Sequence, residues 1–348
     1  MEYTQKYIEA ALCSAFENFI GGKPEVIAKL MGDASARSIY RLSAGEIRAM
    51  GVFGPDLLEN RAFLGFTRTF RRLNLPAPEI YWQAPDRRYY LLEDLGDITL
   101  FRKLVELRAG GDDFPREAIA GDYREAVRWL AKFQMEAADE IDYNLCYQTA
   151  EFDNSAWEAD QRYFLECFVK ALLPGFKRSS GLEREFREHR KLLEKFPRCA
   201  FLYRDFQSRN IMVTPTGLRF IDYQAGRKGF PAYDIAALVY DARACLPQGF
   251  REELISLHAE SVGSEIPGGK DSLLEAFNLF ALLRILQALG SYGNNGILKG
   301  KKEYLASIPL GLCNALGLLS SDPRLKKFTL LYEILSRINT EKNWGKPI

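Results

Sequence analysis

A carboxylate and an amide, Asp205 and Asn210, lie five residues apart in residues 201–213 (FLYRDFQSRNIMV). Apolar runs at 201–203 and 211–213 flank the polar segment that holds them. A surface turn usually contains glycine or proline, and this segment contains neither. A second carboxylate, Asp222, follows the next apolar stretch. We therefore expect a catalytic loop that is held by buried strands.

The residues between Asn210 and Asp222 have the pattern of a β-hairpin. Four residues run outward, three turn around Thr216, and four return. A hairpin centred on Thr216 places Asn210 opposite Asp222, with Cα atoms roughly 5 Å apart. Mg²⁺ prefers such oxygen ligands, and phosphoryl transfer needs a further carboxylate to accept the proton of the attacking hydroxyl. Asp205 suits that role, although spacing alone also allows an ordinary hairpin with a surface acid at each end.

Two linked motifs carry a family resemblance. Tyr203-Arg204-Asp205-x-x-x-x-Asn210, followed by Ile221-Asp222-Tyr223-Gln224, resembles the catalytic and metal motifs of the kinase-like aminoglycoside phosphotransferase superfamily. The resemblance implies ATP as phosphate donor, Asp205 as catalytic base, and Asn210 and Asp222 as magnesium ligands. Tyr203 departs from the histidine that is frequent in these enzymes, and Tyr223-Gln224 departs from the Phe-Gly of protein kinases. Neither departure removes a ligand.

A turn between the first two expected strands is a candidate phosphate-binding loop, because backbone N–H groups in such a turn can cradle phosphates. The candidate residues are Gly32, Asp33, Ala34, Ser35 and Arg37. A plain hairpin turn is the alternative. The pattern G-D-A-S-x-R-x-Y resembles that of bacterial N-acetylmuramate/N-acetylglucosamine anomeric kinases. Residues 91–96 resemble their adenine-binding hinge, which implies that the backbone of Glu93 and Leu95 meets the base.

The third expected strand lacks the lysine with which kinases usually hold the α- and β-phosphates. Arg48 is its only cation, and we assign it to the phosphates as a hypothesis, with a solvent-facing position as the alternative. Glu59 would be the ion-pair partner of a kinase lysine. Without that lysine it is expected to be a surface acid. The missing lysine keeps open a nucleotide-binding regulatory module without turnover.

Candidate acceptor-binding residues are two arginines. Arg227 lies shortly after the second metal ligand and could bind the transferred phosphate or an acidic acceptor, or lie in a solvated turn. Arg284 belongs to R-x-x-Q-x-x-G, which resembles the C-terminal helices of the amino-sugar kinases. Asp234 is expected to be a helix N-cap. Eight acids in residues 136–161 suit either a polycationic aminoglycoside or, as we prefer, a solvated linker.

Two parts of the chain differ in the secondary structure that their patterns predict. Before residue 95, short apolar runs predict strands at 26–31, 38–42, 46–53, 79–83 and 89–93, with a helix at 55–73. Beyond it, helical spacing dominates, at 122–138, 157–173, 182–196, 234–245 and 272–289. We expect an α+β protein with a two-lobed, protein-kinase-like fold. Residues 1–95 form a small antiparallel-sheet lobe that binds nucleotide, and 96–348 form a larger helical lobe with the catalytic loop.

Composition narrows the function classes. The 348 residues carry 47 basic and 46 acidic side chains, a net charge of +1, which does not suggest a nucleic-acid partner. Six scattered cysteines without a C-x-x-C pair, and only two histidines, disfavour a zinc site. The N-terminus lacks the apolar core of a signal peptide, and residues 304–321 resemble a buried helix more than a membrane span. We expect a soluble cytoplasmic protein.

Together these features predict an ATP- and magnesium-dependent small-molecule kinase. Its acceptor would be a hydroxyl of a sugar or amino sugar, with the anomeric position as the specific hypothesis. Two alternatives stay open, an aminoglycoside kinase and the regulatory module without turnover.

Overall fold

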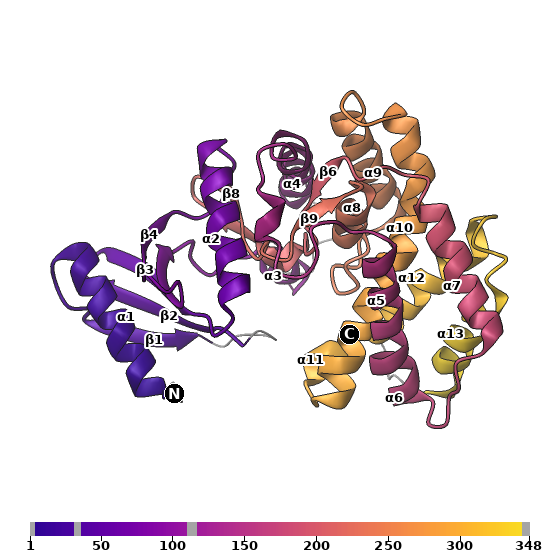
Figure 1. The fold of residues 1–348 in the computed structure, drawn as a ribbon, viewed down its shortest axis with the longest axis horizontal. Coiled ribbons are helices and arrows are strands. Elements are labelled where there is room, and N and C mark those ends of the chain that lie inside the picture. The colour runs from indigo at the N-terminus through magenta and orange to yellow at the C-terminus, as the bar shows by residue number, and fades with distance from the viewer. Residues whose placement is uncertain (1–3, 31–35, 110–116, 343–348) are drawn as a thin grey trace.

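The computed structural model describes residues 4–30, 36–109 and 117–342. Within them the chain forms two lobes, a small N-lobe drawn in indigo and purple and a larger helical C-lobe (Figure 1). The predicted α+β, two-lobed fold is confirmed. The boundary proposed at residue 95 falls between the last N-lobe strand and the first C-lobe helix.

The N-lobe is an antiparallel sheet covered by a helix on each face. Its strand order is β1-β2-β3-β5-β4. The elements are α1 (Gln5–Ile20), β1 (Val26–Leu30), β2 (Ser38–Ala44), β3 (Ile47–Phe53), α2 (Leu57–Arg72), β4 (Ile80–Gln83) and β5 (Tyr89–Glu93). Side chains alternate along β5, so that Leu91 packs with α1, whereas Tyr90 and Leu92 pack with α2. The face of the sheet that carries Tyr90 and Leu92 is therefore the face that α2 covers.

Helix α1 was not predicted from the sequence, although its signals are present. Thr4 caps the helix by accepting a hydrogen bond from the N–H of Tyr7. Ile8, Leu12 and Phe16 recur at helical spacing and are buried against the sheet.

The C-lobe is built around α10, a helix whose side chains are buried on most sides. Its helices are α3 (Leu100–Ala109), α4 (Glu117–Glu136), α5 (Asn154–Phe164), α6 (Lys170–Leu172), α7 (Ser180–Leu193), α8 (Ala232–Val239), α9 (Gln248–Val262), α10 (Gly269–Tyr292), α11 (Lys302–Leu305), α12 (Ile308–Ser321) and α13 (Thr329–Glu341). Short 3₁₀ turns span Tyr143–Leu145 and Ser208–Asn210, and π-helical turns span Leu165–Val169 and Gly293–Leu298. Two small antiparallel pairs, β6 (Ala200–Leu202) with β9 (Arg227–Gly229) and β7 (Ile211–Thr214) with β8 (Gly217–Phe220), hold the loops that face the N-lobe.

Several predicted boundaries in the C-lobe were wrong. Helix α4 begins at Glu117 and not at Asp122, whose carboxylate forms an ion pair with Lys103 instead of capping the helix. Helix α8 ends at Val239, several residues before the predicted end at 245. The apolar run at 201–203 was expected to belong to a buried strand and overlaps β6. Strand β9 and its pairing with β6 were missed, because a strand of three residues leaves almost no alternating pattern in a sequence.

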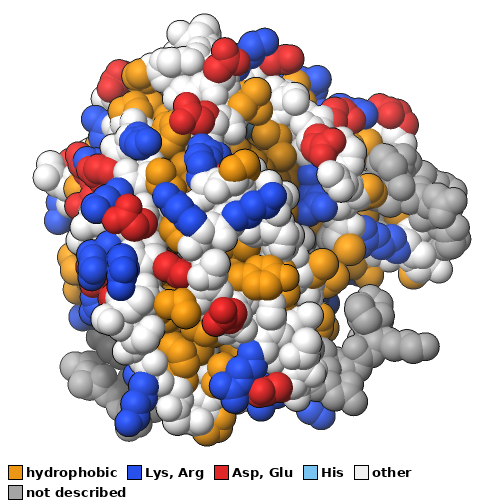
Figure 2. All heavy atoms as spheres, turned by 90° about the vertical axis from the view of Figure 1, so that its right-hand side faces the viewer, with side chains coloured by type: hydrophobic (Ala, Val, Ile, Leu, Met, Phe, Trp, Pro, Cys, Tyr) orange, Lys and Arg blue, Asp and Glu red, His pale blue; other side chains and the backbone are white. Residues whose placement is uncertain are grey.

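The outer face of the C-lobe carries basic, acidic and apolar side chains interspersed with one another (Figure 2). Among the described residues, two helical stretches are apolar and long enough to cross a membrane by length and composition alone, Gly269–Leu298 and Lys302–Ser321. The first is 72% buried within the protein, as expected of the central helix of a packed lobe.

Candidate active site

The hairpin after the polar segment has a different register from the predicted one. Ile211 pairs with Phe220 and Thr214 pairs with Gly217, so the turn contains two residues, and Asn210 comes opposite Ile221 instead of Asp222. A slip of one residue would normally turn a side chain to the other face of the strand pair. Asp222 compensates because its backbone is left-handed, with φ of 69°. The two side chains consequently still meet, with Asn210 Nδ2 3.5 Å from Asp222 Oδ2.

The loop at 203–210, for which a catalytic role is expected, is held in place by a buried carboxylate. Asp234, fully buried in α8, accepts hydrogen bonds from the backbone N–H groups of Tyr203 and Arg204, at 2.7 and 2.8 Å, and from Gln134 Nε2 at 2.9 Å. Burial raises its pKa to about 6 against the opposing effect of these hydrogen bonds. The expected N-cap role is wrong, because Asp234 lies inside the first turn of α8 and bonds to a distant loop.

Arg204 anchors the same loop toward α5. Its guanidinium lies 2.6 Å from Asp160 and stacks over the ring of Phe152 at 4.5 Å. Arg204 also has a positive φ of 82°, a backbone conformation that residues other than glycine rarely adopt. The hydrogen bond that the N–H of Arg204 donates to Asp234, together with the buried ion pair, keeps this strained residue in place.

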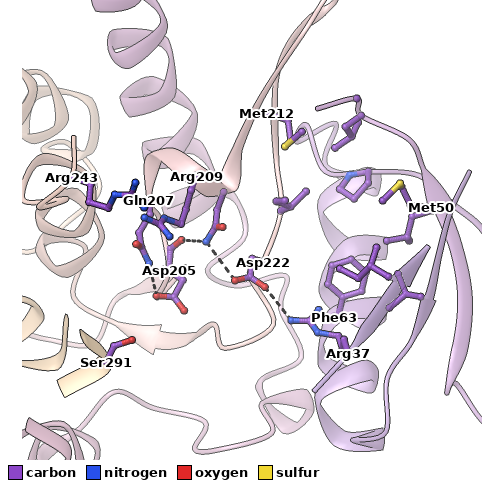
Figure 3. Close-up of a pocket in the computed structure, with 18 of the residues that line it drawn as sticks. Arg37, Met50, Phe63, Asp205, Gln207, Arg209, Met212, Asp222, Arg243 and Ser291 are labelled. Atoms are coloured by element: carbon purple, nitrogen blue, oxygen red, sulfur yellow. Dashed lines mark hydrogen bonds and ion pairs between the residues drawn. The ribbon is translucent and has the colours of Figure 1, made fainter. Parts of the chain in front are cut away.

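Asp205, Asn210 and Asp222 all line one cavity of about 530 Å³ between the lobes. The side chain of Asp205 is 36% exposed, so a substrate can reach it. Asn210 Nδ2 donates to the backbone carbonyl of Asp205 at 2.9 Å, which ties the amide to the carboxylate-bearing loop. The same amide nitrogen lies 3.5 Å from Asp222 Oδ2, and Figure 3 shows Asp205 and Asp222 near each other in the cavity. An amide oxygen and a carboxylate form a donor set that fits magnesium.

The N-lobe side of the cavity is mostly apolar. It is lined by Ile39, Met50, Val52, Phe63, Leu92 and, from the C-lobe, Met212 and Ile221. Glu93, Asp94, Leu95 and Gly96 form its back edge, where the two lobes join. Asp94 shapes this edge, because it forms an ion pair with Arg41 and accepts from the N–H of Gly96, whose φ is 81°. An apolar slot with backbone groups at its rim has the character of an adenine site.

Arg37 enters the same cavity and forms two ion pairs. Its Nη2 lies 3.0 Å from Glu59 on α2 and 3.0 Å from Asp222 (Figure 3). Glu59 is therefore not the surface acid that was expected. Burial alone would lower the pKa of Arg37, but Asp222, Tyr90 and Glu59 outweigh burial and raise it.

Most of the remaining predicted site residues are not among the described residues that line the cavity. Gly32, Asp33, Ala34 and Ser35 lie outside the described residues. Arg48 and Arg227 are described but are not among the residues that line the cavity. Arg48 is exposed at the beginning of β3. Arg227 is buried and donates to Thr149 and Gln148, and burial together with Arg204 lowers its pKa to about 10. Neither arginine therefore lines the cavity that holds Asp205, Asn210 and Asp222.

Arg284, in contrast, lines the C-lobe side of the cavity. Its Nη2 lies 3.7 Å from Asp205 Oδ1, and its Nη1 donates to Gln287 at 2.6 Å. Two further arginines, Arg209 and Arg243, line the same side and were missed. Both lie over the ring of Phe101, at 5.5 and 5.0 Å. Arg209 lies between Asp205 and Asn210, and this position could have identified it as a site residue. Arg243 has no local signal in the sequence.

The acids of residues 136–161 lie away from this cavity, since none of them is among its lining residues. Glu140 pairs with Arg72, Glu151 with Arg198 and Asp160 with Arg204. Asp142 and Asp153 cap helices. The preferred interpretation of this stretch as linker and helix starts agrees with these positions.

Comparison with known proteins places the chain among the kinases. The sequence profile of the phosphotransferase enzyme family matches residues 31–263. A protein from Pseudomonas aeruginosa named N-acetylmuramate/N-acetylglucosamine kinase is 28% identical over 299 residues, 82% of this chain and 81% of the relative. A protein of the same name from Caulobacter vibrioides is 24% identical over 347 residues, 90% of this chain and 93% of the relative.

Solved structures agree on the fold. An ethanolamine kinase from Plasmodium vivax has a TM-score of 0.60 at 11% identity and covers 93% of this chain and 91% of its own. A spectinomycin phosphotransferase in complex with ADP and spectinomycin has a TM-score of 0.57 at 11% identity, covering 93% and 98%.

Fold and comparisons together define the class, which is that of small-molecule kinases. Within that class, this chain belongs to the phosphotransferase enzyme family. The resemblance inferred from the catalytic and metal motifs is confirmed.

Proposed function

We propose that this protein transfers the γ-phosphate of ATP to a hydroxyl group of a sugar or amino sugar, in a magnesium-dependent reaction. The observation that carries the proposal is the convergence of Asp205, Asn210 and Asp222 on one cavity beside an apolar slot of the N-lobe. Relatives that cover more than 80% of the chain bear the name N-acetylmuramate/N-acetylglucosamine kinase. A cytoplasmic location is part of the same proposal.

Each residue has a stated task in this reaction. Asp205 accepts the proton of the acceptor hydroxyl while that oxygen bonds to the γ-phosphorus and the bond to the ADP oxygen breaks. Asn210 and Asp222 hold magnesium, which neutralises charge on the β- and γ-phosphates when bound. The backbone of Glu93 and Leu95 meets the adenine edge. The anomeric hydroxyl is the first position to test, because it is the most acidic hydroxyl of a reducing sugar and suits a carboxylate base.

Charge on the acceptor side disfavours a polycationic aminoglycoside. Among the described lining residues of the C-lobe are Arg209, Arg243 and Arg284 and the acids Asp205, Asp222 and Glu303. With Asp222 assigned to magnesium, three arginines face two acids that are left for the acceptor. A cationic acceptor would meet like charges, which costs affinity at such short range. A neutral or acidic sugar avoids that cost.

A panel of acceptors tests the proposal directly. ATP, magnesium and the purified protein are incubated with N-acetylglucosamine, N-acetylmuramate, glucose, choline, kanamycin and spectinomycin, and products are identified by mass spectrometry and phosphorus NMR. We expect phosphorylation of an N-acetyl amino sugar. Asp205→Asn should then reduce kcat by about 10²- to 10⁴-fold, and Asp222→Asn should abolish magnesium-dependent turnover. Products from aminoglycosides alone would contradict the acceptor class, and ATP binding without any product would contradict the kinase assignment.

A further inference from the structure

The third strand presents no cation to the cavity. Met50 and Val52 are the β3 residues that line it, and both are apolar. Val52 pairs with Ile39 of β2 and with Tyr90 of β5, which places it in the middle of the sheet. Arg48 precedes Met50 and Val52 along β3 and is exposed at the beginning of the strand. The strand position from which kinases extend their phosphate-binding lysine is thus occupied here by apolar side chains.

A cation nevertheless reaches the cavity from the neighbouring strand. Arg37 immediately precedes β2, whose first residue, Ser38, pairs with Phe53 at the end of β3. The side chain of Arg37 is only 12% exposed and lies over the same end of the sheet as Val52. Its guanidinium lies 3.0 Å from Glu59, whose side chain is 20% exposed.

The carboxylate that holds Arg37 is itself firmly placed. Glu59 belongs to the first turn of α2, where Asp56 accepts hydrogen bonds from the N–H groups of Leu58 and Glu59. Capping fixes the start of this helix and with it the position of the Glu59 side chain. An ion pair between a helix glutamate and a strand cation is the arrangement that a kinase requires to hold the α- and β-phosphates.

We infer that Arg37 supplies, from the beginning of the second strand, the phosphate-binding cation that other kinases carry on the third, and that Glu59 is its positioning residue. A guanidinium has five N–H donors in a rigid fork, so it can bind Glu59 and a phosphate oxygen at the same time. Its contact with Asp222 shows that it already reaches the carboxylate assigned to magnesium. The inference rests on the proposed function, because it concerns the phosphates of a bound nucleotide.

Nucleotide binding tests the inference without requiring turnover. Affinities of wild type, Arg37→Ala and Arg37→Gln for ADP with magnesium, and for adenosine, are measured by isothermal titration calorimetry. Loss of a charged hydrogen bond to phosphate should weaken ADP binding by about ten- to hundredfold. Adenosine binding should change by less than twofold, because adenosine has no phosphate. Arg61→Ala, at an exposed arginine of the same helix as Glu59, is the matched control and should behave as wild type.

Glu59→Gln separates positioning from direct contact. The glutamine keeps the size of the side chain but weakens the hold on Arg37, so ADP affinity should fall by about three- to tenfold while adenosine affinity stays the same. Unchanged ADP affinity in both Arg37 variants would overturn the inference, and so would an equal loss for adenosine. A wild type that binds no ADP at all would instead refute the proposed function, which keeps the two failures distinguishable.

Discussion

The buried carboxylate of Asp234 provides the sharpest test of how this fold positions its catalytic loop. It accepts hydrogen bonds from the backbone N–H groups of Tyr203 and Arg204 and from Gln134, and these two loop residues lead directly into Asp205. Substitution of Asp234 should therefore disturb the placement of Asp205 without touching the cavity, since Asp234 is not among its lining residues.

The size of the effect follows from the number of donors that lose an acceptor. A buried donor without a partner costs about 1–3 kcal/mol. Asp234→Ala leaves two such donors, the N–H groups of Tyr203 and Arg204, while Gln134 Nε2 keeps the backbone carbonyl of Pro231 as an acceptor, so the substitution should cost about 2–6 kcal/mol. That is a large part of the total stability of an ordinary domain, about 5–15 kcal/mol. Asp234→Asn keeps one acceptor oxygen and the side-chain volume, and it removes a carboxylate whose pKa burial raises to about 6. We expect it to fold and to lose only about 1–3 kcal/mol.

Activity should respond more strongly than stability. A displacement of about 1 Å at a catalytic group can cost about 10²-fold in rate, and we expect kcat of Asp234→Asn to fall by about this factor. Urea unfolding measures the stability of each variant. Steady-state kinetics with the acceptor found by the panel measures kcat.

A second buried aspartate serves as the matched control. Asp322 accepts hydrogen bonds from Asn278 and Arg324 but lies away from the cavity. Asp322→Asn should lower stability and leave kcat within twofold of wild type. If Asp234→Asn kept wild-type kcat, or if both variants lost it equally, the positioning argument would be refuted.

Two further predictions concern protonation and the acceptor. Burial lowers the pKa of His258 to about 3, so the native state holds this histidine neutral while the unfolded chain binds a proton below about 6.5. The free energy of unfolding therefore falls as pH drops below 6.5, and this histidine accounts for about 2 kcal/mol of the loss between pH 6.5 and 5. Urea unfolding at both pH values should show a smaller loss for His258→Gln than for wild type. An identical loss in the two proteins would contradict the argument. Arg284→Ala should raise the KM for the acceptor at least tenfold with ADP affinity unchanged, because Arg284 lies 3.7 Å from Asp205 on the C-lobe side; a change confined to ADP affinity would place Arg284 with the nucleotide instead.

Local patterns predicted most of the site-bearing elements. β5 was predicted with its observed bounds and β1, β2, β3 and α2 within two residues, because alternation and helical spacing are properties of neighbouring residues. Asp205, Asn210 and Asp222 could be grouped for the same reason, since a hairpin joins residues close in sequence. Arg209 and Arg243 could not, because their shared contact with Phe101 unites three distant segments.

The spacing of a few polar residues between apolar runs was enough to group Asp205, Asn210 and Asp222, since short loops and hairpins bring sequence neighbours together whatever surrounds them. Their interpretation as a kinase-like catalytic loop came from the resemblance of the two motifs to the aminoglycoside phosphotransferase superfamily. The register of that hairpin was decided by its two-residue turn and by the left-handed backbone of Asp222. The contact of Arg37 with Asp222 was decided only by packing of the two lobes, because Asp222 lies 185 residues away along the chain. The cation proposed to bind the phosphates is the one whose side chain reaches the cavity between the lobes. That cavity exists only after the lobes have folded against each other.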